Sequence, residues 1–157
     1  MLEKCIKSFD SCIFIEQLKK ARGITKAEAL SICREEIPKE SYYQNKIRKA
    51  IARRYPEAYV FKVNQGPYSQ TGVPDLAVVY RGHYFGFEVK RPVLGEVSKL
   101  QAAAIQAIGR AGGTAAVVRW PEECFEIIDN WEKADGVVRE AIASARLLAG
   151  AQTGGEK

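Results

Sequence analysis

The sequence contains one histidine, His83, and no two cysteines at CxxC spacing. A zinc site built from cysteine and histidine is therefore not indicated. His83 falls at a predicted tight turn, where an exposed turn residue is a simpler interpretation than a metal ligand or a catalytic base. No signal-peptide pattern precedes the cysteines, so we expect reduced thiols in a cytoplasmic protein. The cysteines are Cys5, Cys12, Cys33 and Cys124.

Long hydrophobic runs and internal repeats are also lacking. No apolar stretch approaches the roughly 20 residues of a membrane-spanning helix, so we expect no membrane partner. The chain has 157 residues, of which 46% are hydrophobic, and this suits one compact domain.

Positive charge is in excess, with a formal net charge of +5 and a pI of about 9.0. Between Pro38 and Lys62, seven basic residues stand against Glu40 and Glu57. Such a stretch suits a polyanionic partner, although a solvated helix face is equally compatible with it. The basic residues are Lys39, Lys46, Arg48, Lys49, Arg53, Arg54 and Lys62.

Helical patterns open the chain. Residues 10–22 predict one helix that ends at Gly23, and Thr25 with Glu28 three residues later has the spacing of a capping box. A DNA-binding helix-turn-helix would give this pattern, but any helical hairpin would give it too, and we favour the hairpin. We divide the chain into a helical extension (1–37), a core (38–120), C-terminal helices packing on the core (121–149) and a flexible tail (150–157).

The core is predicted to be an α/β fold. A helix at about 41–54 precedes strand-like segments at 58–63, 75–80 and 84–91, a helix from Ser98 to Gly112, and a strand at 114–119. A strand, a helix and a strand in succession imply a right-handed crossover and a parallel pair. We therefore predict a mixed sheet in the order αβββαβ, antiparallel at its start, flanked by helices. Two more helices are expected at about 122–133 and 135–149.

The helix at 41–54 carries an apolar stripe, formed by Tyr43, Ile47, Ala50 and Ile51. Projected one turn back, the stripe reaches Glu40. If the helix begins early enough, this carboxylate faces the core, whereas Lys46, Lys49 and Arg53 face outward.

Ionisable residues cluster around the second and third predicted strands. Because side chains alternate along a strand, Glu88 and Lys90 share a face. If Arg81-Gly82 is a two-residue hairpin loop, Asp75 lies opposite Glu88. Like charges opposed at this spacing repel, and a divalent cation such as Mg²⁺ would offset the repulsion. A three-residue loop would instead place Asp75 on the opposite face.

Two further side chains complete this candidate site. The Lys90 ammonium could orient and deprotonate an attacking water, or could stabilise developing phosphorane charge. Gln101 lies in line with Ile105 and Ile108 on the next predicted helix. Its amide either caps a local backbone group or points into the site, and beside the ionisable cluster we favour the site.

These residues match a known pattern. Pro74-Asp75, then Glu88-x-Lys90, then Gln101 resembles the PD-(D/E)xK nuclease superfamily. The wider segments GVPDLAVV, GHYFGFEVKRP, SKLQ and AGGTAAVV are similar to its virus-type replication-repair branch, the VRR-NUC domain, in the small stand-alone form found in phages. The resemblance covers about residues 40–120.

The resemblance implies a restriction-endonuclease-like core in which Asp75, Glu88 and the main-chain carbonyl of Val89 bind Mg²⁺ or Mn²⁺. Lys90 would act at the water, and Gln101 would support the site. It also implies a homodimer that cleaves branched DNA, as Holliday-junction resolvases do. The residues expected to contact DNA phosphates are Lys46, Lys49, Arg53, Lys62 and Arg91.

One departure from the family pattern concerns the helical metal ligand. Family members usually carry a glutamate on the first core helix, and Glu40 is the nearest carboxylate, although Ser41, Tyr43 or Gln44 could occupy that position instead. The alternative functions are a restriction-like or nicking nuclease on duplex DNA, and a non-catalytic DNA-binding module on the same fold. Gly66 and Gly72, which flank the loop before Asp75, would allow close approach of a strand, or else serve turns with positive φ.

Overall fold

The computed structural model describes residues 11–63 and 72–152. It divides into two units, Met1–Cys124 and Phe125–Lys157. Gly66, Cys5 and the last residues of the expected tail, 153–157, lie outside the described residues.

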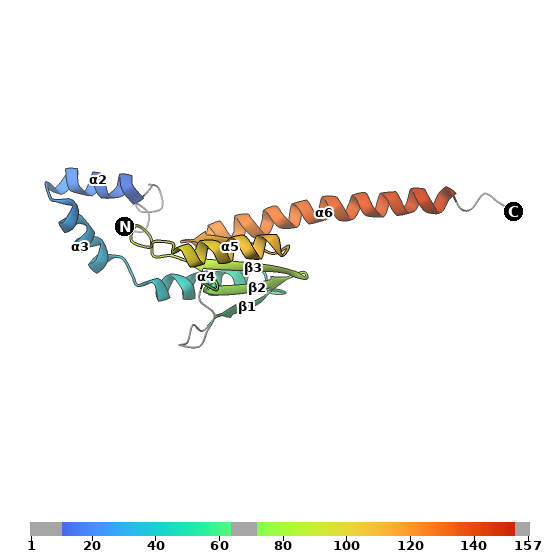
Figure 1. The fold of residues 1–157 in the computed structure, drawn as a ribbon, viewed down its shortest axis with the longest axis horizontal. Helices are drawn as coiled ribbons and strands as arrows, with labels where there is room; N and C mark the ends of the chain where they lie inside the picture. Colours follow the sequence, from blue (N-terminus) through green and yellow to red (C-terminus); the bar gives the residue numbers. More distant parts are fainter. Residues whose placement is uncertain (1–10, 64–71, 153–157) are drawn as a thin grey trace. The chain divides into compact units, whose positions relative to one another are not determined.

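The first unit contains the predicted core in the predicted order. Helix α4 (Glu40–Arg54) is followed by β1 (Tyr59–Lys62), β2 (Leu76–Tyr80), β3 (His83–Val89), α5 (Lys99–Arg110) and β4 (Thr114–Val118). The strands form one sheet in the order β1-β2-β3-β4. Figure 1 labels β1, β2 and β3 one beside the next. The first two pairings are antiparallel and the β3–β4 pairing is parallel, which confirms the mixed sheet and the αβββαβ order.

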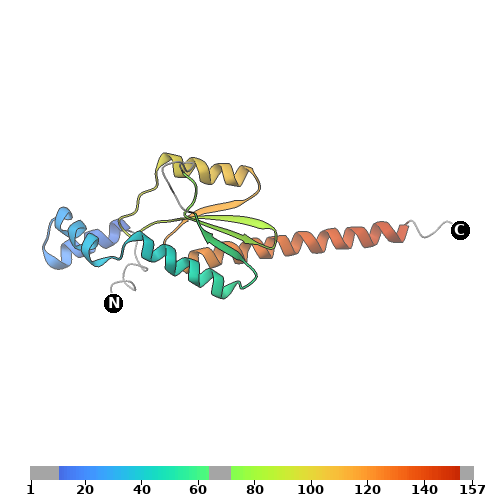
Figure 2. The same cartoon turned by 90° about the horizontal axis from the view of Figure 1, so that it is seen from below.

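Helices α4 and α5 lie on opposite sides of this sheet (Figure 2). On the α4 side, Tyr43, Ile47 and Ile51 are fully buried, as the apolar stripe predicted. On the α5 side, Ile108 lies so close to β3 that a Cβ at Gly86 would be 3.3 Å from its Cδ1. Because side chains alternate along β3, Phe85 and Phe87 belong to the α4 side and Glu88 to the α5 side.

The helical extension also folds as the sequence indicated. It contains α2 (Ser11–Arg22) and α3 (Lys26–Glu36). Thr25 caps α3 with the predicted capping box, in which Thr25 accepts from the Glu28 main-chain N–H and Glu28 accepts from that of Thr25. The chain reverses at Gly23, whose φ of 65° suits glycine.

The second unit consists of the helix α6 (Pro121–Gln152), whose first four residues belong to the first unit. Two helices were expected here, and this was wrong. No proline interrupts residues 122–152, and Gly136 lowers helix stability by only about 1 kcal/mol relative to alanine. Asp135 lies at the expected break, and its Oδ2 forms an ion pair of 2.5 Å with Nε of Arg139, one turn later in the helix. The helix also runs into the segment expected to be a flexible tail.

Within the residues that the structure describes, no helix is both long and apolar enough to cross a membrane. Among the described residues, Cys33 and Cys124 are buried free thiols.

Candidate active site

The turn between β2 and β3 sets the register of the site. Arg81 and Gly82 have φ angles of 50° and 81°, as a two-residue type I′ hairpin loop requires. Tyr80 pairs with His83 and Leu76 with Phe87, so the next rung places Asp75 opposite Glu88. The even register predicted from the sequence is confirmed, and both carboxylates lie on the α5 side of the sheet.

Asp75 is held by the backbone at the start of β2. It is 8% exposed, and its Oδ2 accepts a hydrogen bond of 2.9 Å from the main-chain N–H of Val89. Its carbonyl accepts from the N–H of Val63 at 2.8 Å. The carboxylate is therefore oriented by the strand that carries Glu88.

Glu88 is the most buried carboxylate of the site, at 1% exposure. Its Oε1 accepts from Lys90 Nζ at 2.8 Å and from Gln101 Nε2. Its Oε2 is buried and has no hydrogen-bond partner among the described residues. Burial raises the pKa of Glu88, the hydrogen bond from Lys90 opposes this rise, and the charges of Asp75 and Glu40 add to it.

Lys90 follows β3 on the same face as Glu88. The residue is 6% exposed, and its main-chain N–H donates to the carbonyl of Val118 at 2.9 Å, which extends the parallel ladder beyond β3. The loop after it folds back closely, because a Cβ at Gly95 would lie only 2.8 Å from Lys90 Cβ. The ammonium is thus fixed beside the bound oxygen of Glu88.

Gln101 fills both of the roles that the sequence left open. Its Oε1 accepts from the main-chain N–H of Ser98 at 2.9 Å, and its own N–H donates to Ser98 Oγ at 3.2 Å, so the two residues form a capping box. Because the Ser98 N–H requires the amide oxygen, the amide nitrogen faces Glu88. The cap therefore directs the amide nitrogen of Gln101 toward Glu88 on β3.

Glu40 reaches the site from the other side of the sheet. It is the first residue of α4, so the helix begins early enough for the predicted placement. Its Oε2 accepts from the main-chain N–H of Arg91 at 3.3 Å. Of the alternatives, Ser41 is exposed, whereas Tyr43 and Gln44 are buried. Glu40 is the carboxylate of α4 whose charge acts on Glu88.

The five predicted DNA-contacting residues differ in their surroundings. Lys49, Arg53 and Lys62 are exposed. Lys46 is half-buried, with its Nζ 5.6 Å from the ring centre of Tyr42 and 5.7 Å from that of Trp120.

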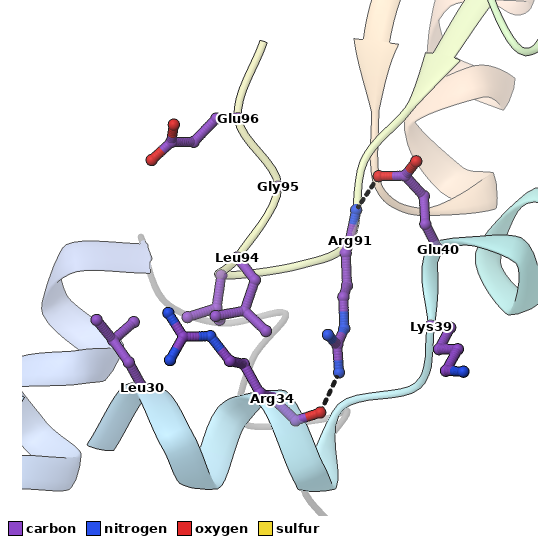
Figure 3. Close-up of a pocket in the computed structure, with 9 residues that line it drawn as sticks. Leu30, Arg34, Lys39, Glu40, Arg91, Leu94, Gly95 and Glu96 are labelled. Atoms are coloured by element: carbon purple, nitrogen blue, oxygen red, sulfur yellow. Dashed lines mark hydrogen bonds between the residues drawn. The ribbon is translucent and has the colours of Figure 1, made fainter. Parts of the chain in front are cut away.

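Arg91 has a structural role that the sequence pattern did not reveal. Its Nε donates to the carbonyl of Pro38 at 2.9 Å, and its Nη2 donates to that of Arg34 at 2.6 Å (Figure 3). Nη2 also donates to the carbonyls of Cys33, at 3.5 Å, and Ile37. The guanidinium therefore caps the C-terminal end of α3 and fastens the extension to the residue after Lys90. In the sequence, the only indication of a role for Arg91 was its position next to the Glu-x-Lys triplet. Its carbonyl partners could not be identified from the sequence because they are more than fifty residues away.

Gly72 has a φ of 87°, and a Cβ there would lie 2.8 Å from the carbonyl oxygen of Leu100. This glycine thus serves a turn with positive φ packed against the start of α5.

The donor set suits a magnesium ion. In the ranges 11–63 and 72–152, no three histidine, cysteine or acidic side chains are grouped so as to hold a metal. Mg²⁺ is commonly bound by one or two carboxylates and keeps several waters, so Asp75 and Glu88 are sufficient as side-chain ligands. Glu88 Oε2 has no hydrogen-bond partner within the described ranges, and a cation here would offset the cost of burying this oxygen.

The mixed sheet, the αβββαβ order and the flanking helices define a restriction-endonuclease-like fold. No family model and no curated protein matches the sequence. Among solved structures, a chain described as a VRR_NUC domain is similar to this one, with a TM-score of 0.45 and 21% sequence identity. The match covers 55% of this chain and 95% of that chain.

Proposed function

We propose that this chain is a metal-dependent endonuclease that hydrolyses phosphodiester bonds of branched DNA. The observation that carries the proposal is the state of Glu88, whose Oε1 is bound by Lys90 and Gln101 while its buried Oε2 has no hydrogen-bond partner among the residues that the structure describes. A purely structural carboxylate in this position would have both oxygens satisfied.

Asp75, Glu88 and the main-chain carbonyl of Val89 would hold Mg²⁺ or Mn²⁺, with Glu40 as a further ligand. The cation supplies Lewis-acid stabilisation of phosphoryl charge and lowers the pKa of bound water. Val89 orients Asp75 through its N–H, and Gln101 fixes the rotamer of Glu88. Lys90 positions the attacking water or stabilises developing charge from its Nζ, which lies 2.8 Å from Glu88.

The substrate and assembly follow from the same proposal. Lys49, Arg53 and Lys62 present exposed positive charge to DNA phosphates, together with Lys46. Arg91 acts mainly by fastening α3 beside the site. Paired, symmetric cuts in a four-way junction require two active sites, so we propose that the chain acts as a homodimer in the cytoplasm of a phage host.

The test uses labelled four-way junction, linear duplex and single-stranded DNA, each incubated with and without Mg²⁺. Asp75→Asn is the matched control, because asparagine can still accept from the Val89 N–H while removing the charge. Metal-dependent symmetric cuts in the junction, absent from the variant, are expected. Cuts confined to linear duplex would favour a restriction-like nuclease. DNA binding without cleavage in Mg²⁺ or Mn²⁺ would contradict catalysis and favour a binding module.

A further inference from the structure

A cavity of about 540 Å³ adjoins the candidate active site. It lies between α3, the first turn of α4 and the loop after β3 (Figure 3). Leu30 and Arg34 line it from the extension, and Leu94 and Glu96 line it from the loop. The extension and the catalytic core therefore build this cavity together.

The cavity wall is continuous with the active site. Arg91 and Gly95 both line it, Arg91 directly follows Lys90, and the Gly95 backbone lies against Lys90. Glu40 also lines it and is hydrogen-bonded to Arg91. A DNA strand whose phosphate lies at Glu88 and Lys90 would therefore place a neighbouring nucleotide at this cavity.

The lining combines positive charge with apolar surface. Arg34, Lys39 and Arg91 oppose Glu40 and Glu96, which leaves a small positive surplus. Across the described residues, the structure shows no ion pair or hydrogen bond for the side chains of Arg34 and Lys39, whereas Arg91 and Glu40 are engaged with the backbone. Figure 3 shows the Arg34 guanidinium between Leu30 and Leu94 in this view. Arg91 Nη2 donates to the main-chain carbonyl of Arg34 at 2.6 Å, so the Arg34 side chain extends from an anchored backbone.

The loop carries a strained residue at the cavity. Val93 has a φ of 67°, a conformation that is rare for a β-branched side chain. Strained backbone of this kind tends to occur at ligand-binding segments, where the surrounding structure maintains it. Leu94 and Gly95 stabilise the tight loop through hydrogen bonds of 2.8 Å to the carbonyls of Pro92 and Arg91.

The size of the cavity limits its occupant. Ligand pockets for small molecules have volumes of about 300–1,000 Å³, so this one suits a single nucleotide. A base enters such a pocket only when it is unstacked and unpaired. A cationic group beside aliphatic side chains matches the phosphate and the base of that nucleotide.

We propose that this cavity receives an unpaired nucleotide of the cleaved strand, next to the scissile phosphate, with its phosphate at Arg34 and its base against Leu30 and Leu94. This inference rests on the proposed nuclease function and adds a substrate requirement to it. The extension thereby selects DNA that is unpaired beside the cut.

The test measures DNA binding by the full chain with Asp75→Asn, so that cleavage does not interfere. The probes are a paired duplex and the same duplex with one unpaired 2-aminopurine, whose fluorescence reports unstacking. We expect at least about tenfold tighter binding of the unpaired probe, and loss of that preference in Arg34→Ala. Leu94→Ala should reduce the fluorescence change. The matched control is Arg22→Ala, because Arg22 is an exposed arginine of α2 that does not line the cavity. This variant should retain the preference for the unpaired probe.

Several results would overturn this proposal and leave the nuclease function standing. If Arg34→Ala weakens binding of the paired and the unpaired probe equally, Arg34 makes a general phosphate contact. Preference only for a probe with a terminal phosphate would identify a strand end as the ligand. The proposal would also be contradicted if Asp75→Asn without further changes binds both probes equally while the wild type cleaves DNA in a metal-dependent way. Failure of the wild type to cleave any DNA would instead contradict the proposed function.

Discussion

The side chain of Gln101 connects Glu88 to the N-terminal turn of α5, because its nitrogen donates to Glu88 Oε1 while its oxygen caps Ser98. Gln101→Glu keeps the capping oxygen but replaces the donor with a negative charge. We expect cleavage to fall about 10- to 100-fold with little change in melting temperature. The matched control is Ser98→Ala, which should lower the free energy of unfolding by roughly 1 kcal/mol and retain cleavage. Equal cleavage by Gln101→Glu and the wild type would contradict the role given to the amide.

Addition of Mg²⁺ should stabilise the folded chain. A cation that binds only the folded state, at 100 times its Kd, adds about 2.7 kcal/mol to the free energy of unfolding. The melting temperature should therefore rise by several degrees, and Asp75→Asn should remove most of the rise. Differential scanning fluorimetry over a Mg²⁺ series measures both. The same rise in wild type and variant would show that the cation binds elsewhere.

Gly95→Ala should disturb Lys90. The added Cβ would lie 2.8 Å from Lys90 Cβ and from the carbonyl oxygen of Arg91, so the loop or the lysine must shift. We expect at least a tenfold loss of cleavage rate, since a displacement of about 1 Å can lower a rate by about 100-fold. Gly109→Ala is the control, because its Cβ meets open space inside α5. It should leave the cleavage rate unchanged and add about 0.5–1 kcal/mol to stability.

The salt dependence of DNA binding should identify phosphate contacts. The slope of log K against log salt is negative, and each lost contact reduces its magnitude by about 1, so Lys49→Ala and Arg53→Ala should each make the slope less steep. Fluorescence anisotropy in EDTA measures the slope without cleavage. The control is Lys20→Ala, since Lys20 is an exposed lysine of α2, and this variant should leave the salt slope unaltered. An unchanged slope in all three variants would place the DNA on another surface.

The capping box of α3 should make the extension sensitive to acid. The hydrogen bonds from the Thr25 backbone and hydroxyl lower the pKa of Glu28 below its ordinary value. The stability that Glu28 contributes is therefore present above the ordinary pKa of glutamate and is lost as the pH falls through the lowered pKa. Hydrogen exchange of α3 amides should show this loss in the wild type and not in Glu28→Gln. Identical pH profiles for the two proteins would contradict the contribution.

The local features of this protein follow from its sequence. Alternation along 84–91 placed Glu88 and Lys90 on one face, the Arg81-Gly82 dipeptide set the register with Asp75, and the Thr25–Glu28 spacing predicted a capping box. These inferences succeeded because each depends on residues close together in the chain. The break expected near Asp135 failed because one favourable ion pair and the absence of proline outweighed a weak local signal.

The tertiary structure alone decided which distant groups meet. It showed that Gln101 serves the cap and Glu88 at once and that Arg91 donates to carbonyls at the end of α3. It also showed that Glu88 Oε2 has no hydrogen-bond partner in the part of the chain that the structure describes. The contacts of Glu88 and Arg91 with distant residues have no sequence signature, because hydrogen bonds between distant segments depend on how helices pack against the sheet. The cavity beside Lys90 arises in the same way, since its walls come from two segments that only the fold brings together.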